Sequence, residues 1–143
     1  MIMISRLGSA LIALSLAMSS GQATAEVVAV VSAKNPVSSL SKNYVADIFL
    51  GKTSKFPDGS RAMPVDQSEG SAARDAFYLQ FTGKSPAQVK MYWSKMIFTG
   101  RGQPPHEVPN GVAMKKHLVE HPDEIGYIER KLLDDTVKVI STE

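Results

Sequence analysis

Residues 26–32 read EVVAVVS, an uninterrupted apolar run that is rich in β-branched valine. A run of this length and composition predicts a β-strand buried on both faces, and the Lys34-Asn35-Pro36 turn that follows would end it. Strands buried on both faces occur in sheets that helices cover from either side. The stretch therefore indicates an α/β fold with this strand inside the sheet.

The segment before this strand has the features of a secretory signal peptide. Arg6 supplies a positive charge, residues 7–18 are uncharged and mostly apolar, and Ala23-Thr24-Ala25 has the small-x-small form that signal peptidase cleaves. The apolar part is shorter than the ~20 residues of a membrane-spanning helix, so we expect cleavage rather than a retained anchor. Lipid attachment is excluded because the chain has no cysteine. We thus expect a signal peptide at residues 1–25 and an exported domain at residues 26–143.

The charge of the chain is nearly balanced. Its 143 residues include 16 Lys and Arg and 14 Asp and Glu, and the net charge of +2 falls to +1 without Arg6. Basic and acidic residues are interleaved and form no basic stripe, which argues against nucleic-acid binding. Without cysteine the fold must be stabilised by its core, and a domain of this length can bury a sufficient one.

Downstream of residues 26–32, predicted helices and strands alternate along the chain. Helices are predicted where apolar residues recur at helical spacing behind a capping residue, and strands where short apolar runs lie between turns. In chain order they are a helix capped by Ser41 and ended by Gly51, a strand at 61–65, a helix ending at Thr82-Gly83, a helix opened by the Ser85-Pro86-Gln88 capping box, a helix capped by Asn110, and strands at 125–128 and 136–140. We expect a single layered α/β domain whose mainly parallel or mixed sheet is flanked by helices.

Two further local predictions concern residues 61–109. Pro64 indicates that its strand lies at a sheet edge or that the proline is near a strand end. Residues 100–109 hold two glycines and three prolines, so they are expected to be an irregular loop. The helix after Ser85 carries a stripe of Val89, Tyr92, Trp93 and Met96, which at helical spacing is typical of core packed against a sheet rather than of a ligand platform.

Two polar loops follow the first two predicted strands, where ligands collect in open α/β sheets. Residues 66–71 lead directly into a helix, whose unpaired N–H groups and dipole suit an anion. Ser68 and Ser71 could donate hydroxyls, Gly70 would permit close approach, and Arg74 would add positive charge. The candidate anion-binding residues are Ser68, Gly70, Ser71 and Arg74, with Asn35, Ser38 and Ser39 of the first loop.

A purely structural interpretation of residues 66–74 stays open, and residue types alone favour it. Ser68 would cap the helix, Glu69 would complement its dipole, and Arg74 would point to solvent. Glu69 would also repel an oxyanion, so binding would need Arg74 or Arg101 to offset its charge.

Catalytic patterns are missing from the sequence. There is no cysteine nucleophile and no Gly-x-Ser-x-Gly elbow, and no serine, histidine and acid can be grouped. His117 and His121 have a spacing that can bind a metal, but their order differs from His-Glu-x-x-His and no third ligand is evident. We expect a solvated helix end there, and no metal, cofactor or enzymatic activity.

A set of short segments occurs along the chain in a recognisable order. They are residues 35–40 (NPVSSL), 47–52 (DIFLGK), 57–59 (PDG), 64–65 (PV), 69–71 (EGS), Phe77, 92–93 (YW), 100–102 (GRG) and 125–128 (IGYI). Together they resemble phosphate-type periplasmic solute-binding proteins of ABC transporters, and most of all the small, stand-alone members. The resemblance covers essentially all of residues 26–143 and implies a fold like one lobe of a type II periplasmic binding protein.

The resemblance also implies where a ligand would bind. In the larger relatives an Arg and an acidic-Gly-Ser-Gly-Thr loop grip phosphate, and this loop corresponds to residues 69–73 (EGSAA). Ala72 and Ala73 replace the second glycine and the threonine, and Asp66 or Gln67 stands at the arginine position. A single lobe would leave the half-site open and weakly binding unless another molecule covered it.

Two functions of different class follow from these observations. The first is an exported, non-enzymatic solute-binding-like protein that binds phosphate or another small oxyanion in connection with ABC-type phosphate transport. The alternative, which Asp66, Ala72 and Ala73 favour, is a periplasmic protein-interaction or structural module that keeps the lobe fold without a ligand. The implied partners are the oxyanion, an ABC transporter membrane component or another envelope protein, and a second copy of the chain as a homodimer.

Overall fold

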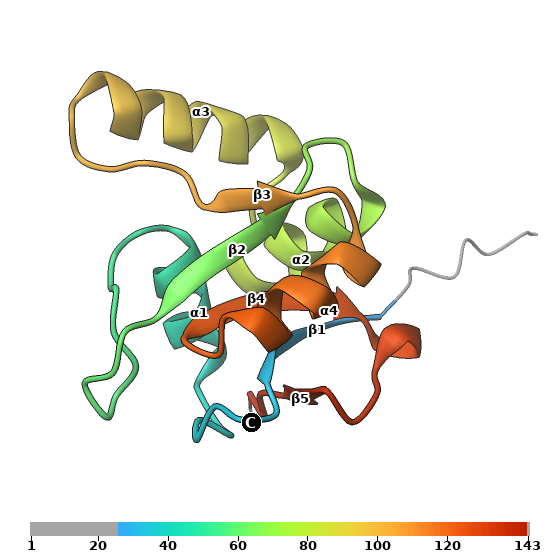
Figure 1. The fold of residues 1–143 in the computed structure, drawn as a ribbon. Coiled ribbons are helices and arrows are strands. Elements are labelled where there is room, and N and C mark those ends of the chain that lie inside the picture. The colour runs from blue at the N-terminus through green and yellow to red at the C-terminus, as the bar shows by residue number, and fades with distance from the viewer. Residues whose placement is uncertain (1–25, 143) are drawn as a thin grey trace, which may run out of the picture.

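A five-stranded mixed sheet forms the centre of the computed structural model, which describes residues 26–142 (Figure 1). In sheet order β3-β2-β4-β1-β5, the strands are β3 (His106–Val108), β2 (Met63–Gln67), β4 (Glu124–Glu129), β1 (Val27–Ser32) and β5 (Val137–Val139). Strand β2 is parallel to β3 and β4, whereas β1 is antiparallel to β4 and β5. The expected α/β fold with a mixed sheet is confirmed. The predicted signal peptide lies outside the described residues.

Helices cover both faces of this sheet. They are α1 (Lys42–Phe49), α2 (Ala72–Thr82), α3 (Pro86–Phe98), α4 (Gly111–Glu120) and the short 3₁₀ helix η1 (Arg130–Leu132). Helices α1 and α2 pack on one face, and α4 packs on the other (Figure 1). None of the helices within residues 26–142 has the length and apolar character that a membrane crossing requires.

Strand β1 is buried on both faces, as its valine-rich sequence predicts. All six of its residues are buried, and alternate side chains enter different cores. Val27, Ala29 and Val31 join the larger core beneath α1 and α2, whereas Val28 and Val30 join the smaller core beneath α4. Because successive strand residues point to opposite faces, this one strand connects the two layers of helices.

The helix ends follow the predicted capping residues. Ser41, Ser85 and Asn110 each accept a hydrogen bond from a backbone N–H of the first helical turn, and Ser85 forms the full capping box with Gln88. Gly51 adopts a left-handed conformation with φ of 74° at the end of α1. These predictions are confirmed. The caps were predictable because each one depends on residues that are close together in the sequence.

Three local predictions need correction. A short strand, β3, occupies part of the predicted loop at residues 100–109, and pairs in parallel with the second half of β2. Strand β2 runs over Met63–Gln67 instead of 61–65 and lies inside the sheet, so the edge position is wrong, whereas the alternative that Pro64 is near a strand end is confirmed. Trp93 is buried as expected, but α3 packs chiefly on α2, and the ring of Trp93 covers Gly51 rather than the sheet.

Candidate functional site

The two polar loops proposed as one site lie at opposite ends of the sheet. Strand β1 runs antiparallel to β4, and β4 runs parallel to β2, so the ends of β1 and β2 point in opposite directions. Asn35, just after β1, donates from Nδ2 to the carbonyl oxygen of Pro122, at the start of β4. Ser68 and Arg74 lie beyond the far end of β2. The two loops therefore cannot share one small ligand.

The loop after β1 is tied into the fold by its own hydrogen bonds. Asn35 is buried, and its Oδ1 also accepts from the N–H of Val37 at 2.9 Å. Ser38 and Ser39 are exposed, and their backbone pairs with Ser141 near the end of the chain. Both bonding groups of the Asn35 side chain thus have structural partners, and no candidate from the second loop approaches this segment.

The loop after β2 delivers its chain directly into helix α2. Ser71 is the N-cap, since its Oγ accepts from the N–H of Arg74 at 3.3 Å. The same hydroxyl faces the side-chain oxygen of Gln67 at 3.2 Å, whereas Ser68 contacts the carbonyl of Val108 at 3.3 Å and does not cap the helix. Among the described residues, the N–H groups of Ala72 and Ala73 have no acceptor. Ala72 is exposed and Ala73 is buried, so the N–H of Ala72 is the more accessible of the two to an anion.

Asp66 lies directly beneath this helix start and is only 1% exposed. Tyr78 donates to its Oδ2 at 2.6 Å, and Tyr127 donates to its Oδ1. Burial raises the pKa of Asp66, although these hydrogen bonds and Arg74 oppose the rise. Burial and the neighbouring Asp66 also raise the pKa values of both tyrosines, so the hydroxyls stay protonated as donors.

Sequence reasoning placed Asp66 in a loop and missed its two tyrosine partners. Tyr78 could have been found from the sequence, because it lies next to Phe77 on the buried side of α2. Tyr127 could not, because it lies on β4, far from Asp66 in the sequence. The network explains why an aspartate is tolerated in the interior: a buried carboxylate is stable only when donors surround it.

The positive charge of Arg74 is already compensated. Its side chain is 13% exposed, and Nη1 lies 2.5 Å from Glu107 Oε1 on β3 and 3.8 Å from Asp66 Oδ2. The same nitrogen donates to the carbonyl of Gln67 at 3.0 Å. Desolvation acts to lower the pKa of Arg74, but Asp66 and Glu107 raise it overall, so it is a permanent cation. An anion at the α2 start would compete with Glu107 for this guanidinium.

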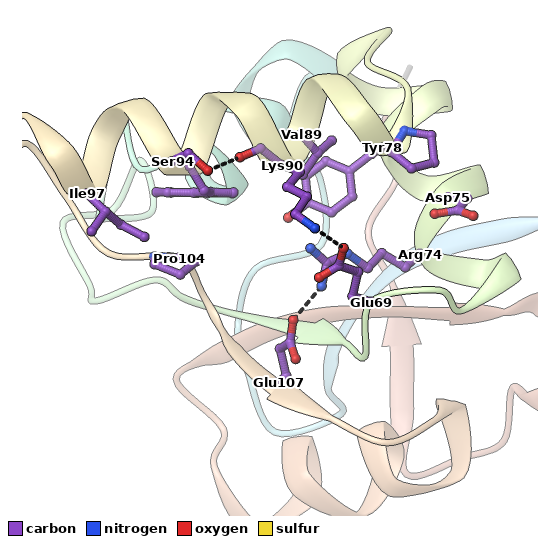
Figure 2. A pocket seen from close by; sticks show the side chains of 12 residues that line it. Glu69, Arg74, Asp75, Tyr78, Val89, Lys90, Ser94, Ile97, Pro104 and Glu107 are labelled. Atoms are coloured by element: carbon purple, nitrogen blue, oxygen red, sulfur yellow. Dashed lines mark hydrogen bonds and ion pairs between the residues drawn. The ribbon is translucent and has the colours of Figure 1, made fainter.

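A cavity of about 190 Å³ adjoins Arg74 between α2, α3 and the segment before β3 (Figure 2). Its charged lining consists of Glu69, Arg74, Asp75, Lys90 and Glu107. Three of these groups are acidic and two are basic, and Lys90 is paired with Glu69 at 3.7 Å. The cavity thus has room for a small solute, but its walls carry no excess of positive charge.

The second candidate considered from sequence, the His117–His121 pair, does have a neighbouring third ligand. Glu124, the first residue of β4, lies beside both histidines, so the inference that no such group accompanies them is wrong. This cluster is at the start of β4, which is the end of the sheet that also holds Asn35.

Solved structures of known proteins share the fold of this chain. No protein-family model and no curated protein matches the sequence. The structure matches a Clostridium perfringens protein described as a phosphate ABC transporter substrate-binding protein with bound phosphate, with 22% identity and a TM-score of 0.62 over 80% of this chain and 43% of that chain. An ABC-type phosphate transport receptor from Vibrio cholerae gives 19% identity and a TM-score of 0.63 over 80% of this chain and 44% of that one.

A third match, PstS from Borrelia burgdorferi, has 12% identity and a TM-score of 0.56 over 80% of this chain and 46% of that chain. The described chain therefore spans less than half the length of each of these proteins. Its five-stranded sheet and four helices match a lobe of phosphate-binding proteins, which confirms the expected fold.

Proposed function

We propose that this chain is an exported, non-enzymatic solute-binding-like protein in which the start of α2 holds a small oxyanion such as phosphate. The observation that carries the proposal is the pair of free N–H groups of Ala72 and Ala73, at the carboxyl end of an internal strand. Unpaired N–H groups and the helix dipole attract anions there. The fold supports the same ligand class, since one protein with this lobe is described with bound phosphate.

The charges around α2 predict that binding is weak. Asp66 and Glu107 already compensate Arg74, and Glu69 lies in the loop that an oxyanion would approach. The described residues match one lobe of the larger proteins, and any partner that covers the half-site would exclude water from it. We expect affinity to rise when a second copy of the chain, or another envelope protein, covers the half-site.

Export and a connection with ABC-type phosphate transport complete the proposal. Residues 1–25 have the composition of a signal peptide, and the matched structures include an ABC-type phosphate transport receptor. A transporter membrane component is therefore the partner class we propose. Export is tested by comparing the N-terminus of the protein recovered from the periplasm with that of the cytoplasmic precursor; cleavage is expected after Ala25.

Ligand binding is tested by the melting temperature of the purified protein in increasing phosphate, with chloride at matched ionic strength as the control. A ligand at 100 times its Kd stabilises a protein by about 2.7 kcal/mol, so even millimolar affinity gives a measurable shift at high phosphate. A phosphate-specific shift that Ser38→Ala leaves intact and Ala72→Pro reduces would support the α2 site. Proline is accepted at the first helical position but removes the N–H that would bind the anion.

The alternative function, an interaction or structural module without a ligand, is favoured by the compensated Arg74 and by the outer surface of α3. Met91 and Phe98 on this helix are 72% and 93% exposed. Two results together would favour this alternative over ligand binding. The first is that phosphate causes no specific shift in melting temperature. The second is that the protein forms a stable complex with a component of an envelope extract and that Phe98→Ser abolishes this complex.

A further inference from the structure

All three histidines of the chain lie at one corner of the fold. The rings of His117 and His121 are stacked with centroids 4.2 Å apart, and His106 on β3 lies 5.5 Å from His117. They come from two elements, and neither the phosphate-type fold nor the α2 site uses them. The corner is at the start of β4, opposite the proposed oxyanion site.

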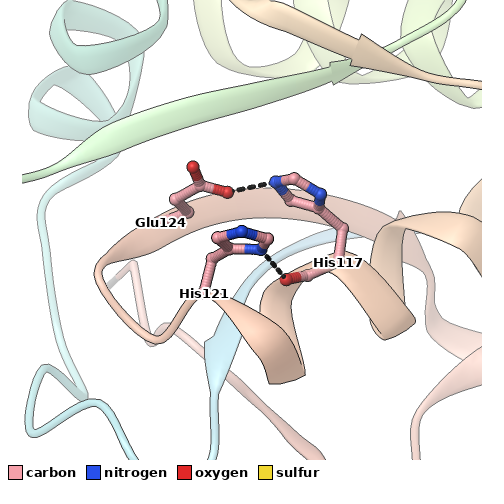
Figure 3. A group of neighbouring side chains, drawn as sticks. All are labelled: His117, His121 and Glu124. Carbon is pink, nitrogen blue, oxygen red and sulfur yellow. Dashed lines mark hydrogen bonds and ion pairs between the residues drawn. The ribbon is translucent and has the colours of Figure 1, made fainter.

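Glu124 completes a set of three donor groups with His117 and His121. One donor atom from each side chain lies within 4.8 Å of the other two (Figure 3). The histidines are one helical turn apart on α4, and a tight turn then reverses the chain so that Glu124 faces them. The N–H of Glu124 donates to the carbonyl of His121 at 3.0 Å, which fixes that reversal.

Hydrogen bonds to two backbone carbonyl groups hold the cluster in place. Nδ1 of His121 lies 2.9 Å from the carbonyl oxygen of His117. This contact fixes the ring of His121 and leaves its Nε2 to coordinate an ion. Asn35, which sequence reasoning assigned to an anion, instead anchors the turn by donating to the carbonyl of Pro122 at 2.7 Å. Such support lowers the cost of organising ligands when an ion binds.

The electrostatics of the cluster call for a cation. Nε2 of His117 and Oε2 of Glu124 are buried and paired with each other, and neither has a second partner among the described residues (Figure 3). Two atoms that both bear lone pairs repel each other at contact unless a proton or a metal ion lies between them. The carboxyl end of α4 adds the partial negative charge of its last carbonyl groups.

We propose that His117, His121 and Glu124 form a binding site for a divalent transition-metal ion of borderline softness, with Zn²⁺ as the best match. Two imidazoles and one carboxylate are a donor set that Zn²⁺ accepts in proteins, with a fourth position left to water. Ni²⁺ and Cu²⁺ share the preference for imidazole, whereas Mg²⁺ and Ca²⁺ prefer oxygen ligands and are excluded by this donor set.

The test is a calorimetric titration of Zn²⁺ into purified protein that carries no histidine tag, at neutral pH. We expect a stoichiometry of about one ion per chain, no heat with Mg²⁺, and a rise in melting temperature that EDTA reverses. His121→Ala is the informative variant because its side chain is exposed and its loss leaves the core intact. It and Glu124→Gln should each weaken Zn²⁺ binding by at least about tenfold.

His106→Ala is the matched control, since this histidine lies beside the cluster but outside the set of three ligands. It should leave the Zn²⁺ affinity little changed, and circular dichroism should show that all variants stay folded. The proposal is overturned if Zn²⁺ does not bind. It is equally overturned if Zn²⁺ binds with the same affinity to His121→Ala. Neither result depends on whether phosphate binds at α2.

Discussion

Arg74 on α2 and Glu107 on β3 form an ion pair across the mouth of the α2 site, with Nη1 and Oε1 2.5 Å apart. The pair links residues 33 positions apart and joins the edge strand to the helix that follows β2. The carboxylate of Glu107 is bound to the guanidinium that an oxyanion would need. An anionic solute can therefore bind Arg74 only if it displaces the carboxylate of Glu107.

The first prediction is that Glu107→Gln strengthens phosphate binding. Glutamine keeps the size and a hydrogen-bond acceptor but removes the competing charge. Because Glu107 is 48% exposed, its pairing energy is reduced by solvent, and a gain of about 0.5–1 kcal/mol, or two- to fivefold in Kd, is expected. Glu120→Gln, at the exposed last residue of α4, is the control for general charge effects. A phosphate response that both variants raise equally would rule out a specific role for Glu107.

The second prediction concerns the cap of α2. Ser71→Ala removes the acceptor for the N–H of Arg74 and should lower the free energy of unfolding by about 1 kcal/mol in urea denaturation. Ser68→Ala, three residues earlier, should cost less because its hydroxyl makes one contact of 3.3 Å to the carbonyl of Val108. The assignment of the cap would be wrong if the two costs were reversed.

The third prediction tests the buried network around Asp66. Tyr127→Phe removes a donor to Asp66 and an acceptor for the N–H of Gln67, so about 1–3 kcal/mol of stability should be lost. Tyr44→Phe is the matched control, because its hydroxyl bonds the carbonyl of Lys55 at an exposed site where water can replace it. Equal losses in thermal or urea unfolding would show that the Asp66 network adds little.

The fourth prediction is that Gly126→Ala destabilises the sheet. A Cβ at this position would lie 2.4 Å from the sulfur of Met114 on α4, closer than packing allows. We expect a loss of about 1–3 kcal/mol from the forced shift of Met114. At Gly102 the nearest atom would be 3.5 Å away, an ordinary contact, so Gly102→Ala should be nearly neutral. A neutral Gly126→Ala would mean that α4 moves away without cost.

The fifth prediction is a pH dependence. Hydrogen bonds from Lys115 and Thr136 lower the pKa of Asp134 from 3.8 to about 2. A depressed carboxyl pKa stabilises the fold above the unfolded value, and this contribution disappears as the pH falls through the folded value. The melting temperature of Asp134→Asn should therefore lie below that of the unmodified protein at neutral pH and converge with it towards pH 2. Asp135→Asn, at the adjacent position, is the control for the loss of one negative charge.

Features that depend on neighbouring residues were predictable from the sequence. The caps at Ser41, Ser85 and Asn110 use side chains and N–H groups within three positions of each other. The burial of β1 on both faces follows from its composition alone, since every residue from Val27 to Val31 is apolar. Short-range pattern is sufficient in these cases because the partners lie on the same segment.

Strand direction was not predictable in this way, and the candidate site depended on it. A run of valines has the same pattern in a parallel and an antiparallel strand, so nothing in residues 26–32 shows that β1 opposes β2. For the same reason the placement of Glu124 next to His117 and His121 required knowledge of the turn at Pro122. Strand β3 was missed because it has three residues and two of them are exposed.

The position of β1 also has a consequence for the order in which the protein acquires its structure. This strand is the first of the fold, but it pairs only with β4 and β5, the last two. The centre of the sheet therefore closes only when both ends of the chain are present, which is a high contact order and predicts slow folding. Until then a hydrophobic strand remains unpaired, so the chain would benefit from a chaperone during synthesis or export.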